Sequence, residues 1–175
     1  VTGTENIMMA AVLAKGQTIL RNVAKEPEVE DLAKFLNSMG AQISGAGTDE
    51  ITINGVDDLT ESIFTIPADR IEAGTYLIAA AVTYGDIVIQ DINANRMNNI
   101  LDKLKLSGAL IETNENSISL SMPHDSIHPV DISTAPFPGF PTDMQAQFTV
   151  LNSLSSGSAV VTENVFENRF MHVQE

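Results

Sequence analysis

Cysteine and tryptophan are absent from the 175-residue sequence, and long hydrophobic runs are absent as well. Without cysteine, the chain can form neither a disulfide nor a thiolate-ligated metal site. Its apolar runs fall short of the roughly eighteen residues that a membrane-spanning helix requires. The N-terminal residues also lack the basic region and apolar run of a secretory signal. We therefore expect a soluble cytoplasmic protein of one or two domains.

Positive charge is also scarce. Nine basic residues stand against twenty-three acidic ones, so the net charge is −14. This charge repels nucleic-acid phosphates and anionic membranes, which makes either an unexpected partner. The three histidines show no metal-ligand spacing, and the sequence contains no glycine-rich phosphate-binding motif. We expect neither a metal nor a cofactor.

The sequence contains an internal repeat in three copies. Each copy begins with an apolar helix, is broken at a glycine and continues as a short apolar strand. Glycine at the break fits the left-handed backbone that ends many helices. The predicted helices begin at Gly3-Thr4, Gly74-Thr75 and Thr142-Asp143, the breaks are Gly16, Gly85 and Gly157, and the strands are 18–20, 87–89 and 159–161.

The first two copies continue with a second helix and a pair of strands that alternate apolar and polar residues. A further strand precedes the second copy and another precedes the third, so a complete copy is β-α-β-α-β-β. The third copy stops as another helix would begin, and the first lacks its initial strand, so we expect an internal piece of a longer repeat. The additional helices are 29–39 and 97–107, the strand pairs are 42–44 with 50–53 and 110–112 with 117–120, and the preceding strands are 62–66 and 130–133.

A proline-rich loop, residues 134–141, precedes the third helix. Pro136, Pro138 and Pro141 fix φ and disfavour helix in the residue before each of them, so the loop stays extended up to Pro141. Asp143 is thereby placed in the first helical turn. It could cap the helix, which is worth about 1 kcal/mol, or it could be the carboxylate of a functional site.

The amino-acid sequence of this loop resembles the Asp loop of the UDP-N-acetylglucosamine enolpyruvyl transferases. These enzymes of bacterial cell-wall synthesis are also called 1-carboxyvinyltransferases. Residues 162–172, 26–28 and 67–72 resemble further motifs of that family, and the resemblance covers the whole chain. It implies transfer of the enolpyruvyl group of phosphoenolpyruvate to the 3'-hydroxyl of UDP-N-acetylglucosamine with release of phosphate. This is the first committed step of peptidoglycan synthesis, on which cell shape and division depend. The loop reads Phe140-Pro141-Thr142-Asp143-Met144-Gln145-Ala146-Gln147.

The same resemblance implies an α/β fold. In the family, six such units make two domains, each an inside-out α/β barrel with helices in the centre and sheets outside, and the substrates bind between the domains. Residues 1–67 would be the last repeat unit of one domain, and residues 68–175 a truncated first part of the other. The missing remainder of the enzyme is then an expected partner. Apolar surface at the open ends would favour self-association.

Three candidate site residues lie in the third copy. Asp143 matches the carboxylate that touches the reacting hydroxyl, as a base or as an orienting group; its place at a helix N-terminus favours its charged form and hence the orienting role. Val165 matches a UDP-sugar contact, made through the backbone, whereas its pattern alone suggests a core residue at a strand end. Arg169 matches an arginine near the anionic ligands, and its pattern alone suggests a surface ion pair with Glu163 or Glu167.

Four further candidates lie elsewhere. Asp69 and Arg70 could bridge the two domains near the cleft or simply begin a helix. Glu26 could face the cleft, although beside Pro27 it also fits an ordinary helix N-terminus. Val1 resembles the end of a segment that holds the nucleotide.

Several of the family's functional groups have no counterpart in the sequence. They are a lysine–asparagine pair, the loop cysteine or aspartate that donates the proton, and further phosphate-binding arginines. We therefore expect the chain to be inactive alone. Two alternatives stay open: the related shikimate-pathway transferase, which would bind shikimate-3-phosphate, and a non-catalytic repeat module, which would bind no nucleotide sugar.

Overall fold

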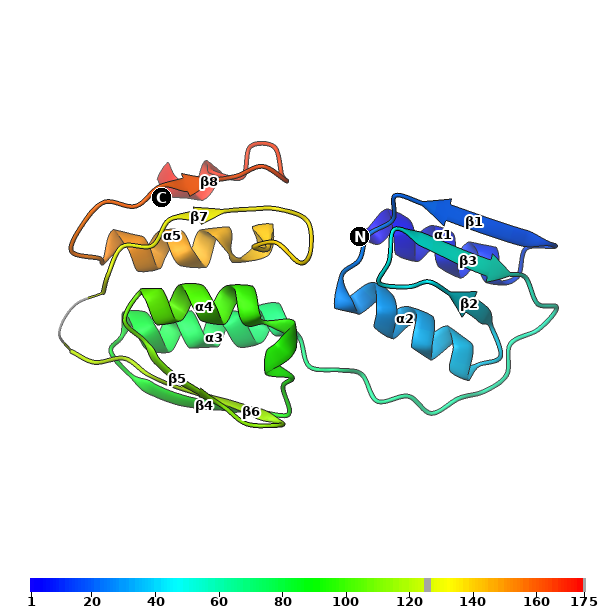
Figure 1. The fold of residues 1–175 in the computed structure, drawn as a ribbon, viewed down its shortest axis with the longest axis horizontal. Helices are drawn as coiled ribbons and strands as arrows, with labels where there is room; N and C mark the ends of the chain where they lie inside the picture. The colour runs from blue at the N-terminus through cyan, green and yellow to red at the C-terminus, as the bar shows by residue number, and fades with distance from the viewer. Residues whose placement is uncertain (125–126, 175) are drawn as a thin grey trace. The chain divides into compact units, whose positions relative to one another are not determined.

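The chain divides between Pro67 and Ala68 into two units, Val1–Pro67 and Ala68–Glu175 (Figure 1). The computed structural model describes residues 1–124 and 127–174. Each unit has its own hydrophobic core. The assignment of these units to two domains of a larger enzyme stays a prediction.

The first unit packs two helices against one face of a three-stranded sheet. The order in the sheet is β1-β3-β2, and β3 is antiparallel to both neighbours. Alternation along β3 buries Ile51 and Ile53 completely, and Met8 of the first helix is buried in the same core. The elements are α1 (Thr2–Val12), β1 (Gln17–Arg21), α2 (Pro27–Ser38), β2 (Gln42–Ser44) and β3 (Glu50–Asn54).

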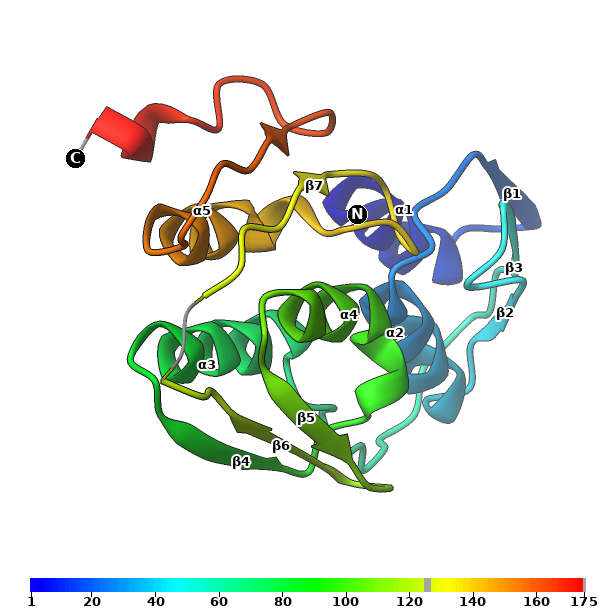
Figure 2. The ribbon, with the colours of Figure 1, turned by 60° about the vertical axis from the view of Figure 1, so that its left-hand side comes forward.

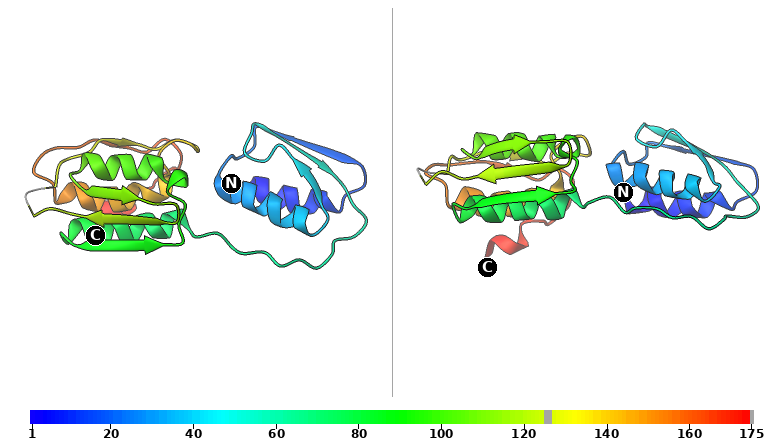
Figure 3. Two further views of the ribbon diagram at one scale, coloured as in Figure 1. Left: turned by 60° about the horizontal axis from the view of Figure 1, so that its bottom comes forward. Right: turned by 90° about the horizontal axis from the view of Figure 1, so that it is seen from below.

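The second unit begins with the same topology. Its sheet has the order β4-β6-β5, again with antiparallel neighbours, and lies over α3 and α4 (Figure 3). Gly40 and Gly108, which follow the second helix of each copy, have φ of 102° and 103°. The predicted order of helix, strand, helix and strand pair is confirmed for these two copies, although α3 begins at Arg70 and not at Gly74. The elements are α3 (Arg70–Val82), β4 (Asp86–Gln90), η1 (Ala94–Arg96), α4 (Asn98–Leu106), β5 (Leu110–Thr113) and β6 (Ser117–Ser121).

The remaining described residues of the second unit form one α-helix, two short 3-10 helices (marked η) and two short parallel strands. The helix α5 packs against α3, and β7 lies on the other side of α5 from α3 and α4 (Figure 2). Helices therefore occupy the middle of this unit and strands its two outer sides. The elements are β7 (Ile132–Ser133), η2 (Thr142–Met144), α5 (Gln145–Ser153), β8 (Val161–Thr162) and η3 (Met171–Gln174).

Several local predictions are wrong. Residues 62–66 form no strand, and Ile63 and Ile66 are 102% and 79% exposed; an apolar strand pattern becomes a strand only where it meets a partner. At the end of α3, the left-handed residue is Tyr84, with φ of 53°, and not Gly85, and Gly157 after α5 is not left-handed either. No helix among the described residues has the length and apolar character needed to cross a membrane.

Candidate functional site

The proline-rich loop is closed on itself and anchored to the core of the second unit. The Ala135 amide donates to the Phe140 carbonyl at 3.0 Å, and the Gly139 amide donates to the Pro136 carbonyl at 2.8 Å. Phe140 is buried and meets the ring of Phe148 in α5 edge-on, with centroids 5.0 Å apart. The loop therefore delivers the following turn, η2, to a defined place at the start of α5.

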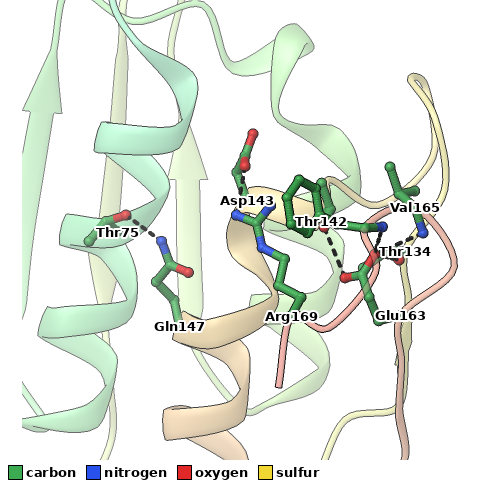
Figure 4. Close-up of polar contacts among 9 residues, drawn as sticks. Thr75, Thr134, Thr142, Asp143, Gln147, Glu163, Val165 and Arg169 are labelled. Atoms are coloured by element: carbon green, nitrogen blue, oxygen red, sulfur yellow. Dashed lines mark hydrogen bonds and ion pairs between the residues drawn. The ribbon is translucent and has the colours of Figure 1, made fainter. Parts of the chain in front are cut away.

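Asp143 lies in η2 and makes an ion pair with Arg169 (Figure 4). A guanidinium Nη of Arg169 donates to Asp143 Oδ1 at 2.8 Å, and the two side chains are 28% and 55% exposed. Neither Thr142 nor Asp143 caps α5 among the described hydrogen bonds. The capping alternative for Asp143 is therefore wrong.

The partner that the pattern suggested for Arg169 is also wrong, because it pairs with Asp143 and not with Glu163 or Glu167. Its guanidinium also lies over the ring of Phe166, 5.3 Å from the centroid. The structure thus brings together two candidates that lie 26 positions apart in the sequence. Guanidinium and carboxylate form a charged, partly open patch that can donate to an anion and accept from a hydroxyl.

Glu163 stands beside this pair and was not among the predicted site residues. Its Oε1 accepts from the Thr134 hydroxyl and from the amides of Val165 and Phe166, each at 2.8 Å. Its Oε2 accepts from the Thr142 hydroxyl at 2.9 Å. Acceptance from amides two and three residues ahead is what a helix-capping side chain does, but no local sequence pattern distinguishes Glu163 for that role.

These hydrogen bonds affect the acidity of Glu163. Burial acts to raise the pKa of the Glu163 carboxyl, but the amides of Phe166 and Val165 and the hydroxyls of Thr134 and Thr142 outweigh it, so the pKa lies below its ordinary value of 4.5. Since the folded pKa is the lower one, the network contributes stability above the unfolded pKa and loses it as pH falls through the folded pKa. The charged groups of the adjoining pair are Asp143 and Arg169.

We expect acid to release this network. As pH falls below 4.5, the amide resonances of Val165 and Phe166 should move toward the positions of non-hydrogen-bonded amides, with the inflection below that of an ordinary glutamate. Amide shifts measured by NMR as a function of pH test this. The inflection should persist in Asp143→Asn and vanish in Glu163→Gln; an inflection that survives Glu163→Gln would assign the titration to another group.

Val165 follows β8 and is 45% exposed, so the alternative that it is a core residue is wrong. Because its amide donates to Glu163, the backbone group it could offer to a ligand is the carbonyl oxygen. A carbonyl accepts from a hydroxyl or an N–H group. A UDP-sugar contact by Val165 stays a prediction, now restricted to that oxygen.

Asp69 and Arg70 lie at the start of α3 in the second unit. Asp69 caps α3, accepting from the Ile71 amide at 2.7 Å and the Glu72 amide at 3.2 Å, as its helix-start alternative predicted. Arg70 is buried, with its guanidinium 5.6 Å from the centroid of the Phe137 ring in the proline-rich loop. Their proposed bridging role stays a prediction.

The remaining candidates, Val1 and Glu26, belong to the first unit. Val1 is half exposed, and its carbonyl accepts from the Glu5 amide at 3.2 Å. Glu26 immediately precedes Pro27, the first residue of α2, as the helix-start alternative predicted, and its side chain makes no cap hydrogen bond among the described contacts. Their ligand roles stay predictions. No cluster of potential metal ligands occurs among the described residues.

A sequence model of the family described as EPSP synthase (3-phosphoshikimate 1-carboxyvinyltransferase) matches residues 1–175. The chain belongs to this family of 1-carboxyvinyltransferases. A relative from Coxiella burnetii is 58% identical over 175 residues, and one from Hydrogenovibrio crunogenus is 56% identical. Both are UDP-N-acetylglucosamine 1-carboxyvinyltransferases by name, the branch that the resemblance indicated. All of this chain aligns, but it spans only 40% and 42% of the lengths of these relatives.

The fold agrees with this membership. The enolpyruvyl transferase NikO from Streptomyces tendae superposes with a TM-score of 0.86 at 22% sequence identity, over 99% of this chain and 41% of that one. The predicted fold class, part of an inside-out α/β barrel, is confirmed.

Proposed function

We propose that this chain supplies part of the sugar-nucleotide site of an enzyme that transfers the enolpyruvyl group of phosphoenolpyruvate to the 3'-hydroxyl of UDP-N-acetylglucosamine. The observation that carries the proposal is the pair Asp143–Arg169, held at 2.8 Å by two segments that resemble the family's motifs. The names of the relatives at 56% and 58% identity support the UDP-sugar as acceptor.

The pair suits two parts of this reaction. The sugar hydroxyl gives its proton to a base and bonds to C2 of phosphoenolpyruvate, while C3 takes up a proton from an acid. C3 then loses a proton as the bond from C2 to the phosphate oxygen breaks, which restores the double bond and releases phosphate. Arg169 engages Oδ1 of Asp143, so Oδ2 is the oxygen that can accept from the hydroxyl and orient it. A guanidinium beside it can attract the anionic groups of the nucleotide or the donor.

Charge limits what these residues do alone. With a net charge of −14, the chain is poorly suited to hold a diphosphate and a phosphate unaided. We propose that most of the cations for these groups, and the proton donor, come from the remainder of a longer enzyme. The product would enter peptidoglycan synthesis, in the cytoplasm.

Titration of the labelled chain with UDP-N-acetylglucosamine tests this proposal. We expect saturable amide shifts at Asp143 and Val165. Asp143→Asn should weaken binding about tenfold to a hundredfold, because a hydrogen bond to a charged acceptor is worth about 1.5–3 kcal/mol. Dissociation constants from the NMR shifts give the comparison.

A matched control is Asp86→Asn, which removes an exposed carboxylate in β4 and should bind like the wild type. Shifts with shikimate-3-phosphate but not with UDP-N-acetylglucosamine would favour the shikimate-pathway alternative, since the family model carries that name. Absence of any shift with either compound would contradict a ligand site on this chain.

A further inference from the structure

The Glu163 carboxylate joins three segments that are separate in the sequence. Its four hydrogen bonds come from Thr134 after β7, from Thr142 in η2, and from the two amides that follow it after β8. Figure 4 shows Glu163 between Thr142 and Thr134. All four partners are donors, which matches an ionised carboxylate, a group that only accepts.

Thr134 makes the connection rigid. It is fully buried, and its hydroxyl donates to Glu163 while accepting from the Asn164 amide at 2.8 Å. The Asn164 side chain adds hydrogen bonds to the Ser133 hydroxyl at 2.9 Å and the Thr134 carbonyl at 3.1 Å. The direct pairing of β7 with β8 covers only two residues of each strand. Side chains therefore supply much of what holds the chain after β8 in place.

Two of the four bonds end next to the ion pair. Thr142 directly precedes Asp143, and Phe166 carries the ring over which the Arg169 guanidinium lies. Glu163 thereby holds the residue that precedes one member of the pair and the residue whose ring packs against the other. It also occupies the Val165 amide, so that the carbonyl is the backbone group left to accept from a ligand.

We propose that Glu163 is a positioning residue of the sugar-nucleotide site, which sets the placement of Asp143, Arg169 and the Val165 carbonyl without touching the ligand itself. The proposal rests on the proposed function for the identity of the ligand. The placement of the ion pair does not depend on that identity and can be tested without ligand.

The experiment compares wild type, Glu163→Ala, Glu163→Gln and Thr142→Val in the full 175-residue chain. Glutamine keeps an oxygen for the three bonds at Oε1, whereas alanine removes all four. Thr142→Val removes only the bond beside Asp143. Glu167→Ala is the matched control, because Glu167 is an exposed carboxylate in the same segment. The readouts are the guanidinium NMR signals of Arg169 without ligand, and the dissociation constant for UDP-N-acetylglucosamine.

We expect Glu163→Ala to average the Arg169 guanidinium signals and to weaken binding on the order of tenfold to a hundredfold, as a displaced site group does. Glu163→Gln keeps the three bonds at Oε1 and loses the one from Thr142, so this variant and Thr142→Val should each weaken binding about threefold to tenfold. If Glu163 only stabilised the fold, Glu163→Ala would have a lower melting temperature. Its Arg169 signals and its affinity for the ligand, both measured below that temperature, would then equal those of the wild type.

Each outcome decides between the two proposals. If the wild type binds UDP-N-acetylglucosamine and Glu163→Ala binds equally well, the positioning role is overturned and the proposed function stands. If the wild type does not bind, the proposed function fails on this chain, and the Arg169 signals still judge the positioning role. Should Glu163→Ala unfold, Thr142→Val decides: unchanged Arg169 signals and affinity would overturn the proposal.

Discussion

Replacing Gly55 by alanine is expected to destabilise the first unit by about 3 kcal/mol or more. Gly55 follows β3, and its amide donates to the Gly16 carbonyl at 2.9 Å. A Cβ at this position would overlap the Ala14 carbonyl oxygen and lie 2.7 Å from the carbonyl carbon. Both are backbone atoms of the segment between α1 and β1, which cannot move aside as a flexible side chain can.

The neighbouring hydrogen bond explains why the clash cannot relax. The Val56 amide donates to the Val12 carbonyl at 2.8 Å, so the residue after Gly55 is tied to the end of α1 as well. Because the stability of a domain is only about 5–15 kcal/mol, the loss should be plain in urea unfolding followed by methyl signals of Ile51 and Ile53.

Gly3→Ala is the matched control in the same unit. Gly3 lies in α1, and a Cβ there would meet nothing within 4 Å. Alanine is a better helix former than glycine by about 1 kcal/mol, so this variant should unfold at the same or a higher urea concentration. Equal midpoints for Gly55→Ala and wild type would show that the turn after β3 is looser than its contacts indicate.

The repeat was readable from the sequence because local patterns determine most of it. The predicted strands 42–44 and 50–53 are β2 and β3 to within a residue, since alternation along them matches a sheet with one buried face. The same holds for β5 and β6. Each of these strands has its partner nearby in the chain, so its pairing follows from the local sequence.

Secondary structure and side-chain contacts that depend on residues far away in the sequence could not be predicted in this way. Residues 62–66 are rich in apolar residues, as a short strand is, but no strand forms there. Capping by Asp143 was a reasonable local alternative, and Arg169, far along the chain, is the partner it has instead. The role of Glu163 could not be predicted for the same reason, because two of its four donors, Thr134 and Thr142, lie 29 and 21 positions away in the sequence.

Phe148→Ala is expected to destabilise the second unit by about 3–5 kcal/mol, the usual cost of removing a buried aromatic ring. Phe148 is fully buried in α5, and its ring meets Phe140 of the proline-rich loop at an interplanar angle of 85°. The substitution leaves a cavity between the helix and the loop and removes an edge-to-face contact worth about 0.5–1.5 kcal/mol within that total. Urea unfolding followed by the methyl signals of the buried Leu77 and Leu151 measures the loss.

Val150→Ala separates loss of the core ring from any general sensitivity of α5. Val150 lies two positions further along the same helix and is 50% exposed, so the variant should lose less than about 1 kcal/mol. Because Phe140 anchors the loop that leads to Asp143, the Phe148 variant should also broaden the amide signals of η2 before it unfolds. A loss of under about 1 kcal/mol in Phe148→Ala would mean that the core closes over the cavity, and that the loop is held by its own hydrogen bonds and not by the ring.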